Sequence, residues 1–319
     1  MKIDKNEMAV RVSILYYEKN IGQNKIAEKM GISRSYVSQL ISYARKKGIV
    51  KISIDYNKNE LRLLRKEIEF KSLFPDLKKI FIMSSRSEVF TENNIGKFAA
   101  PYVADMINES RIIGINLGES VEKTINSLGA SNLHSNPKKK VIQIMGGFSN
   151  SFIVGGSHPN KIVSKLGSLL SGECYFLNCP AILEQPKLRS SLLKENSIRN
   201  VTEHWDNIDL AIMGIGVANK KSKLFNLLNQ DMMNAITGSH ACCELTINFF
   251  DENGNYIPIF EKNKIAISHN QLKKVKTKIL ICNGKYKHRA IISAIKAKMI
   301  DVLITDSITI NSIQKSLNH

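Results

Sequence analysis

Between Gln23 and Ser42 the sequence QNKIAEKMGISRSYVSQLIS carries polar side chains at a spacing suited to contact with nucleic acid. In its second half, polar residues alternate with small apolar ones. Hydroxyl, amide and guanidinium groups in such positions can reach phosphates and base edges. The stretch therefore predicts a helix that enters the major groove of DNA. The candidate DNA contacts are Arg34, Ser35, Tyr36, Ser38, Gln39 and, beyond them, Arg45.

Two short helices joined by a tight turn would present these side chains. Ala27 gives the first helix a small face for close packing, and Gly31 supplies the left-handed residue that the turn needs. Ser33 is expected to cap the second helix by accepting a hydrogen bond from an amide near Tyr36. This arrangement is a helix-turn-helix. The apolar positions that would pack the pair are Ile26, Met30, Ile32, Val37 and Leu40.

The same spacing also occurs in ordinary helical hairpins, so the packing positions alone do not decide the matter. The surroundings favour DNA binding. A helix is predicted over residues 4–19, and residues 49–55 (IVKISID) alternate imperfectly between apolar and polar as the strand of a wing would. Residues 1–58 hold twelve Lys or Arg against five Asp or Glu. We therefore predict a winged helix-turn-helix domain over residues 1–58.

Composition sets the broad class of the chain. With 319 residues and 43% hydrophobic content, it can form a small and a large globular domain. The net charge of +18 and pI near 9.6 favour a polyanionic partner, although a generally Lys-rich composition would give a similar charge. Neither a long apolar run nor an N-terminal signal peptide is present in the sequence. A cytoplasmic protein without membrane contact is expected.

No cofactor or metal site is expected from the sequence. The histidines do not cluster, and the cysteines lack the paired spacing of a zinc site. We interpret the thiols as reduced groups in the core. The cysteines are Cys174, Cys179, Cys242, Cys243 and Cys282.

A linker helix is predicted over residues 59–74, with Leu61, Leu64 and Ile68 on one stripe and Pro75 closing it. Residues 75–319 then alternate short apolar strands with amphipathic helices, the pattern of a doubly wound, Rossmann-like α/β domain with a parallel sheet. The expected strands are KIFIMS, RIIGINL, KVIQIMGG, CYFLNCP, LAIMGIG, KILICNG and DVLITD.

One segment departs from this alternation. ELTINFFDENGNYIPIF is predicted to form two antiparallel strands around a type I′ turn at Asn253-Gly254.

Glycines follow several of the strands, where open α/β sheets bind ligands. The loop GINLGES is the best candidate, because Gly118 lets a backbone amide approach an anion and Ser120 can both cap a helix and donate. Gly146 and Gly147 end another strand, and His158 lies in a nearby glycine-containing segment. Glycine after a strand is also common for turn reasons alone. Together these loops predict one ligand crevice.

The order of these motifs resembles the SorC family of bacterial sugar-responsive transcriptional regulators over nearly the whole chain. The resemblance implies a winged helix-turn-helix joined to a domain similar to sugar-phosphate isomerases and glucosamine-6-phosphate deaminases. It also implies a phosphorylated sugar as effector and a homodimer or homotetramer. The stretches that carry it are QNKIAEKMGISRSYVSQLI, GINLGES, VIQIMGG, DLAIMGIG, ELTINFFDENG and KILICNGKYKHRAIISAIKAKMIDVLITD.

Carried over residue by residue, the resemblance implies that Gly118 and Ser120 form a phosphate loop. Glu244 would contact sugar hydroxyls, and Lys287 would be a basic contact. From spacing alone, Glu244 could instead be an edge-strand charge and Lys287 a solvated lysine. Glu119 departs from the family, which more often has Arg, Ser or Thr there, and its charge would repel a phosphate.

The hairpin also departs from the family pattern. Cys243 and Ile247 stand where the family usually has glycine, and Glu244 replaces the more common Asp. A non-phosphorylated polyol is therefore a second candidate for the effector.

Two functions fit these observations. The first is a regulator whose affinity for a DNA operator changes when a sugar, polyol or sugar phosphate binds. The second is a sugar-phosphate isomerase or deaminase that carries a DNA-binding appendage. Such an enzyme needs a carboxylate base, for which Glu244 is the one candidate in the sequence. Because no second catalytic group accompanies it, we expect a regulator and assign no catalytic residue.

Overall fold

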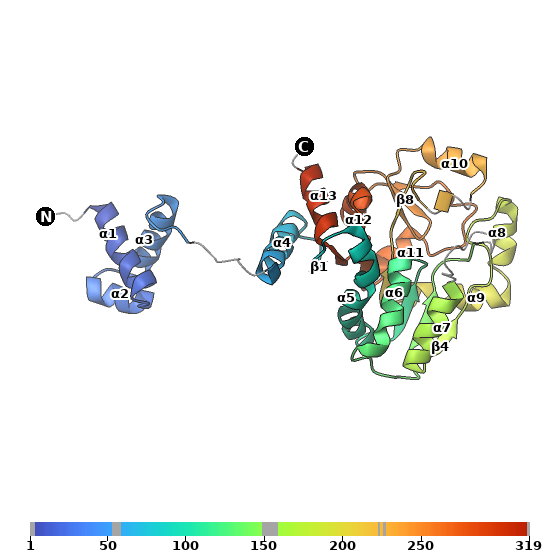
Figure 1. Cartoon of the computed structure of the whole chain (residues 1–319), viewed down its shortest axis with the longest axis horizontal. Coiled ribbons are helices and arrows are strands. Elements are labelled where there is room, and N and C mark those ends of the chain that lie inside the picture. The colour runs from blue at the N-terminus through green and yellow to red at the C-terminus, as the bar shows by residue number, and fades with distance from the viewer. Residues whose placement is uncertain (1–3, 53–58, 149–158, 223, 226–227, 318–319) are drawn as a thin grey trace. The chain divides into compact units, whose positions relative to one another are not determined.

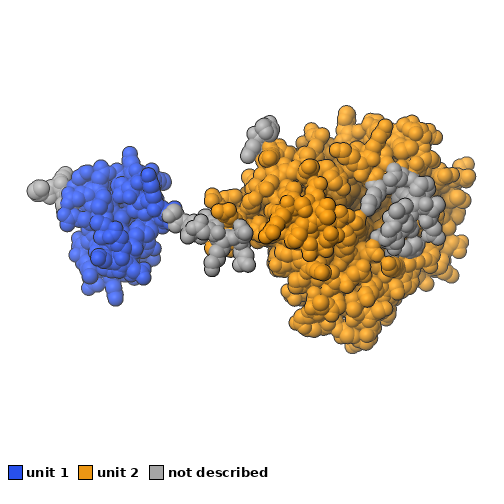
Figure 2. Space-filling model, viewed as in Figure 1, with its two compact units in different colours: residues 1–57 blue, residues 58–319 orange. Residues whose placement is uncertain are grey.

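The computed structural model of the chain describes residues 4–52, 59–148, 159–222, 224–225 and 228–317 (Figure 1). Two compact units make up the chain, residues 1–57 and residues 58–319 (Figure 2). One apolar cluster lies wholly within the first unit and the others lie within the second, so each unit has its own core.

The N-terminal unit is helical. Its buried face is built from Ala9 and Val12 of the first helix, Ile26 of the second and Val37 and Leu40 of the third. The predicted single helix over residues 4–19 is in fact an α-helix that continues as a π-helical turn. The elements are α1 (Lys5–Ser13), η1 (Ile14–Glu18), α2 (Gln23–Met30) and α3 (Arg34–Lys46).

The turn between α2 and α3 confirms the predicted helix-turn-helix geometry. Gly31 ends α2 in the left-handed conformation, with φ 63°. The Ser33 hydroxyl then accepts a hydrogen bond from the Tyr36 amide at 3.1 Å and caps α3. The wing strand predicted over residues 49–55 lies partly outside the described residues. Residues 49–52, which are described, form a bend and an irregular segment rather than a strand.

In the C-terminal unit all seven predicted strands form one parallel sheet in the order β1-β11-β10-β5-β2-β3-β4. The doubly wound α/β prediction is thereby confirmed. The strands are β1 (Lys79–Met83), β2 (Ile112–Ile115), β3 (Lys140–Gln143), β4 (Glu173–Tyr175), β5 (Leu210–Met213), β10 (Thr277–Ile281) and β11 (Val302–Asp306).

Alternate side chains of the strands fill two separate cores. In β5, Leu210 and Ile212 belong to the cluster that also contains residues of α5 (Glu88–Asn108), α6 (Glu119–Ser127) and α7 (Pro159–Leu170). Ala211 and Met213 belong to the cluster shared with α4 (Asn59–Leu73), α12 (His288–Lys296) and α13 (Ser307–Leu317). Because both faces are covered, apolar residues predominate in the central strands on both sides of the sheet.

Helix α4, predicted as a linker, packs on the second of these clusters. Phe70 is fully buried, and the Glu67 carboxylate accepts a hydrogen bond from the Ile82 amide of β1 at 2.8 Å. Shorter helices also lie in the part of this unit that the structure describes. They are η2 (Leu128–Ala130), α8 (Pro186–Leu192), α9 (Asn196–Thr202), η4 (Trp205–Asn207), α10 (Gln230–Thr237), α11 (His269–Lys274) and η6 (Lys285–Lys287).

The predicted antiparallel strands around Asn253-Gly254 are present at residues 248–250 and 256–257, but the turn between them is not type I′ and a further strand precedes them. The segment forms three strands of a second, antiparallel sheet in the order β6-β7-β8-β9. Its tightest turn lies at Thr246 and Ile247, which both have positive φ (53° and 58°), whereas at Asn253-Gly254 only Gly254 does. The strands are β6 (Gly216–Val217), β7 (Cys243–Leu245), β8 (Asn248–Phe250) and β9 (Tyr256–Ile257).

The cysteines are free thiols, as predicted, but only Cys243 and Cys282 lie fully in the core. Burial raises the pKa of Cys179 and of Cys282 to about 12, so these thiols stay protonated near neutral pH. Over the described ranges, no helix is both long and apolar enough to cross a membrane.

Candidate functional site

Helix α3 presents most of the predicted DNA contacts on its outer face. Arg34, Ser35, Ser38 and Gln39 are exposed, while Val37 and Leu40 between them are buried in the core of the unit. The exposed residues recur at three- and four-residue steps, so they form one stripe along the helix. Ser42 continues this stripe and was not singled out from the sequence, because its position on the helix face becomes clear only once α3 extends to Lys46.

Two of the predicted DNA contacts are partly engaged within the protein. Tyr36 is half-buried and packs against the apolar core. The Arg45 guanidinium donates from Nε to the Tyr17 hydroxyl at 2.7 Å and lies 5.8 Å from the centre of that ring. Tyr17 belongs to the π-helical turn η1. The turn η1 therefore holds Arg45, a contact between distant residues that the sequence could not reveal.

The carboxyl ends of β2, β5 and β10 meet at one edge of the parallel sheet. The Ser120 hydroxyl, at the start of α6, donates to Asn283 Oδ1 after β10 at 3.1 Å. The Asn116 side chain, after β2, accepts from the Gly214 amide after β5 at 2.9 Å. Asn116 and Asn283 thus join the glycine-containing loops. The sequence analysis did not identify either asparagine as a candidate.

Glu244 lies on β7 opposite Gly216 of β6. A Cβ atom built on Gly216 would come within 2.5 Å of Glu244 Oε2, so a larger residue there would displace the carboxylate from this position. The other oxygen, Oε1, accepts a hydrogen bond from the Ile247 amide at 2.7 Å. Burial raises the pKa of Glu244, although the Ile247 hydrogen bond and the nearby positive charge of Lys287 act to lower it.

The structure therefore places Lys287 close enough to Glu244 for its charge to act on the pKa of the carboxyl group, although the two residues are 43 positions apart in the sequence. Lys287 lies in η6, four residues after Asn283, which bonds Ser120. Ser120, Asn283, Glu244 and Lys287 are called the carboxyl-edge site below. The arrangement offers an acceptor for sugar hydroxyls and a cation for an anionic group.

The turn that follows Glu244 is strained. Thr246 and Ile247 are β-branched and both take the left-handed conformation, which costs such residues about 1–2 kcal/mol each. The Ile247 side chain is buried, and its amide is the donor to Glu244. Packing thus holds in place a turn in which glycine would be unstrained.

Glu119 and Gly118 lie at the start of α6 and make ordinary local contacts. The Glu119 carboxylate accepts from Lys123 at 3.0 Å along the same helix, and its side chain is 41% exposed. The positive charge of Lys123 partly offsets the negative charge of Glu119, which was expected from the sequence to repel a phosphate. Gly118 is the N-cap of α6, and a Cβ there would meet Gly214 Cα at 3.5 Å, an ordinary contact.

Gly146 and Gly147 are tied to neighbouring backbone. The Gly146 amide donates to the Ile265 carbonyl, and the Gly147 amide donates to the Cys179 carbonyl, both at 2.9 Å. A Cβ on Gly146 would come within 2.7 Å of the Ala181 amide nitrogen. Close backbone packing therefore accounts for Gly146, and neither amide is available to an anion. His158 lies outside the described residues.

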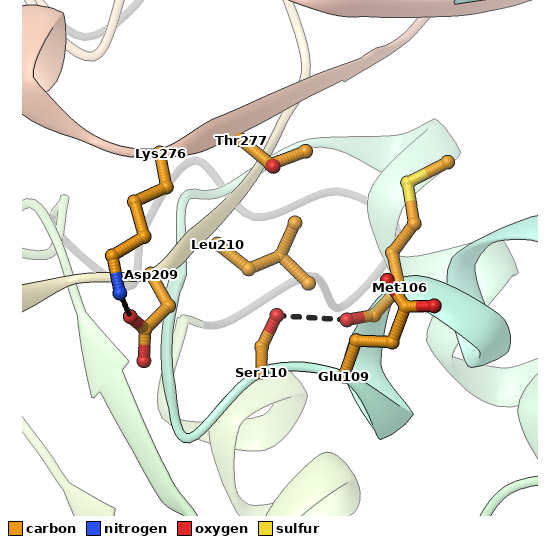
Figure 3. A pocket seen from close by; sticks show the side chains of 7 residues that line it. All are labelled: Met106, Glu109, Ser110, Asp209, Leu210, Lys276 and Thr277. Atoms are coloured by element: carbon orange, nitrogen blue, oxygen red, sulfur yellow. Dashed lines mark hydrogen bonds and ion pairs between the residues drawn. The ribbon is translucent and has the colours of Figure 1, made fainter.

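One hollow lies away from the carboxyl-edge site, and a second borders it, because its lining includes Tyr286 next to Lys287 and Val217 next to Gly216. The smaller, about 150 Å³, is at the amino ends of β5 and β10, where Lys276 is paired with Asp209 (Figure 3). The larger, about 600 Å³, lies between β6, the β8–β9 turn and the start of α12, and Tyr286 and Arg289 are among its lining residues. Over the ranges that the structure describes, no three His, Cys, Asp or Glu residues are grouped to hold a metal ion. The absence of metal and cofactor remains a prediction.

Comparison with known proteins decides the family. Residues 61–315 match the Sugar-bind family model, described as "Putative sugar-binding domain". The sorbitol operon regulator of Klebsiella pneumoniae is 25% identical over 309 residues, which cover 95% of this chain and 96% of that one. The chain belongs to the SorC family of sugar-responsive transcriptional regulators. Family membership makes it a regulator rather than an enzyme.

Other relatives span the SorC-family chain to a similar extent. The deoxyribonucleoside regulator of Bacillus subtilis (strain 168) is 23% identical and covers 99% of this chain and 100% of its own. The crystal structure of the full-length sorbitol operon regulator SorC from Klebsiella pneumoniae shares the fold, with a TM-score of 0.74 at 24% identity over 97% of this chain and 99% of that one. Residues 12–47 also match the model of sigma-70, region 4.

Proposed function

We propose that the chain binds an operator through α3 and that a sugar, polyol or sugar phosphate held at the carboxyl-edge site controls this binding. Two observations carry the proposal: Lys287 lies close enough to Glu244 to act on its pKa, and Ser120 bonds Asn283, four residues before Lys287. A carboxylate that accepts from sugar hydroxyls and an ammonium that pairs with an anion are the groups that a sugar phosphate requires. An operator-binding role also agrees with the expected cytoplasmic location.

Effector recognition can be tested with Lys287→Ala in the full chain. The thermal stability of the parent protein is first screened against glucose 6-phosphate, fructose 6-phosphate, glucose, sorbitol and inorganic phosphate. A ligand at 100 times its dissociation constant adds about 2.7 kcal/mol of stability. For the best ligand, Lys287→Ala should weaken binding by about 10- to 100-fold, because a charged hydrogen bond contributes roughly 1.5–3 kcal/mol.

Lys165→Ala provides a matched control, since Lys165 is exposed on α7. It should bind the ligand like the parent protein. If Lys287→Ala also binds and responds like the parent, the effector site lies elsewhere in the domain.

Operator reading can be tested with Gln39→Ala. Gln39 is exposed on α3, and an amide can contact an adenine edge through two hydrogen bonds. Loss of this contact should cost about 1–3 kcal/mol at one base pair of the operator and relax specificity there. Gln230→Ala on α10 is the control. Unchanged discrimination among operator variants by Gln39→Ala would contradict the assignment.

We also propose that the chain acts as a homodimer or homotetramer. A single recognition helix reads little DNA, and symmetric dimers pair two half-sites. Leu61, Leu64 and Ile68 form an exposed apolar stripe on α4, with 40%, 52% and 61% of their surface accessible. Such a stripe suits contact with a second copy. Light scattering should show an oligomer that Leu64→Glu and Ile68→Glu together weaken; a monomeric parent would contradict the proposal.

A further inference from the structure

Helix α13 is bonded to the loop that carries Lys287. The Thr309 hydroxyl accepts from the Gly284 amide at 3.0 Å, and the Ser312 hydroxyl donates to the Lys285 carbonyl at 3.0 Å. The Lys287 amide in turn donates to the Gly284 carbonyl at 3.0 Å. Two residues of α13 therefore hold both the start and the middle of the short segment that ends at Lys287.

The Thr309 hydroxyl is itself held by a hydrogen bond to Asp306, at the end of β11. It donates to Asp306 at 2.6 Å, and the Asp306 carboxylate also accepts from the amides of Ile308 and Thr309 at 2.8 and 3.1 Å. Asp306 and Thr309 are both buried, with 1% and 0% of their surface accessible. The hydroxyl hydrogen of Thr309 is used in the bond to Asp306. The Thr309 oxygen is therefore oriented to accept from the Gly284 amide.

The same helix contacts α4 through a different side. Lys66 of α4 donates to Asn311 Oδ1 at 2.5 Å. Asn311 lies about 200° around α13 from Thr309, since successive residues of an α-helix are about 100° apart. Buried Ile310 and Ile313 of α13 share an apolar cluster with Phe70 of α4. Helix α13 thus has the Lys287 loop on one side and α4 on another.

Helix α4 is the first element after the DNA-binding unit in the chain. We infer that Thr309 and Ser312 position Lys287 for the effector and that Asn311 passes the state of the occupied site to α4. The inference rests on the proposed function, because it requires an effector that contacts Lys287. A ligand that attracts the Lys287 ammonium moves residues 284–287, and these residues are hydrogen-bonded to α13. A change in α13 then alters its contact with Lys66. The effect is limited to the ligand's differential affinity for the two arrangements.

The test separates effector binding from effector response in the full chain. The probe is whichever of glucose 6-phosphate, fructose 6-phosphate and sorbitol most raises the melting temperature of the parent. Its dissociation constant and the ratio of operator affinities with and without it are measured for each variant. Asn311→Ala should bind the probe within about twofold of the parent, because Asn311 lies outside the site. Its ratio should fall severalfold toward one. Ser316→Ala, on the exposed last turn of α13, should match the parent in both.

Thr309→Val keeps the shape of the side chain but removes both the acceptor for the Gly284 amide and the donor to the Asp306 carboxylate. It should weaken probe binding about two- to tenfold, the expected effect of losing the neutral hydrogen bond to Gly284. Thr309→Ser restores the hydroxyl and should rescue binding. Ser312→Ala supplies the same test if Thr309→Val does not fold. Operator affinity without the probe should stay within about twofold of the parent, which a general loss of structure would not allow.

The outcomes are distinct. If the parent responds to the probe and Asn311→Ala responds equally, the coupling through α13 is overturned while the proposed function stands. If Thr309→Val and Ser312→Ala both fold and bind like the parent, the positioning role is overturned. A parent protein whose operator affinity changes with none of the probes overturns the proposed function and the coupling together.

Discussion

Two carboxylates, Asp209 at the amino ends of the parallel strands and Glu244 on β7 of the antiparallel sheet, have opposite pKa shifts. At the amino edge, burial alone would raise the pKa of Asp209. Hydrogen bonds from Lys276 and from the amides of Ile112 and Arg111 outweigh burial and lower it. In the carboxyl-edge site, burial raises the pKa of Glu244 despite the Ile247 amide and Lys287. Asp209 is thus well supplied with donors by the protein, whereas Glu244 is not.

Other charged groups at the amino edge are also paired within the protein. The Lys278 ammonium and the Asp301 carboxylate form a buried pair at 2.8 Å, and Lys78 adds a second contact at 3.2 Å. Lys139 donates to the carbonyls of Ile107, Asn108 and Ser110. The amino edge therefore uses its charges to hold the fold, and the hollow there is small (Figure 3). The carboxyl-edge site keeps a carboxylate that an external donor can stabilise, which is why we place the effector there.

The largest expected effect is at the amino edge. Asp301→Ala leaves the buried Lys278 ammonium without its partner and should lower the free energy of unfolding by about 3–5 kcal/mol. Urea denaturation measures this change. Asp76→Ala removes an exposed pair with Lys298 and should cost less than about 1 kcal/mol. Equal losses in the two variants would contradict the division between the edges.

Asp209→Asn should have a smaller effect of the same sign. The carboxylate accepts from Lys276 and two amides, so its neutralisation should cost about 1–3 kcal/mol at pH 7. Because folding lowers the pKa of Asp209, its contribution is present above the ordinary pKa and is lost as the pH falls through the folded value. The parent should therefore lose more stability than Asp209→Asn in acid. Parallel pH profiles of the two proteins would count against this account.

Glu244→Gln should change stability in the opposite direction. Folding raises the pKa of Glu244, so the native state binds a proton more tightly and loses stability as the pH rises through the ordinary range toward the raised value. A neutral amide avoids this loss, and the variant should be slightly more stable than the parent at pH 7. Its affinity for the effector should nevertheless fall by about tenfold.

Glu252→Gln, at an exposed pair with Arg289, serves as the control for both measurements. A Glu244→Gln protein that is less stable at pH 7, or that binds the effector like the parent, would break the contrast between the two carboxylates.

The smallest effect is expected for Glu119→Ser. Glu119 is exposed and pairs with Lys123, so the change should alter the free energy of unfolding by no more than about 0.5 kcal/mol. If Glu119 faces a phosphate, the variant should bind sugar phosphates more tightly but sorbitol equally well. Calorimetric titration with both ligands compares the two. An equal gain for sorbitol would show that repulsion of a phosphate is not the cause.

The sequence by itself determined the elements. The helix-turn-helix, its Gly31 turn and its Ser33 cap follow from residues within one or two turns of one another. The strands of the parallel sheet were predicted because strands covered on both faces are apolar along their whole length. Such signals are local, so they can be found without the fold. The family motifs carried Glu244 and Lys287 as candidates, but not their relation to each other.

Only the tertiary structure decided which side chains meet. Ser120 and Asn283 are 163 residues apart, and Arg45 and Tyr17 are 28 apart. Local pattern also missed the tight turn at Thr246 and Ile247, because packing of Ile247 imposes a left-handed conformation that its residue type disfavours. Contacts between distant segments depend on how whole elements pack, and no periodicity within a segment records them. For this reason the sequence could name Ser120, Glu244 and Lys287 as candidates. Their hydrogen-bond partners, the shifted pKa of Glu244 and the connection to α13 came from the fold alone.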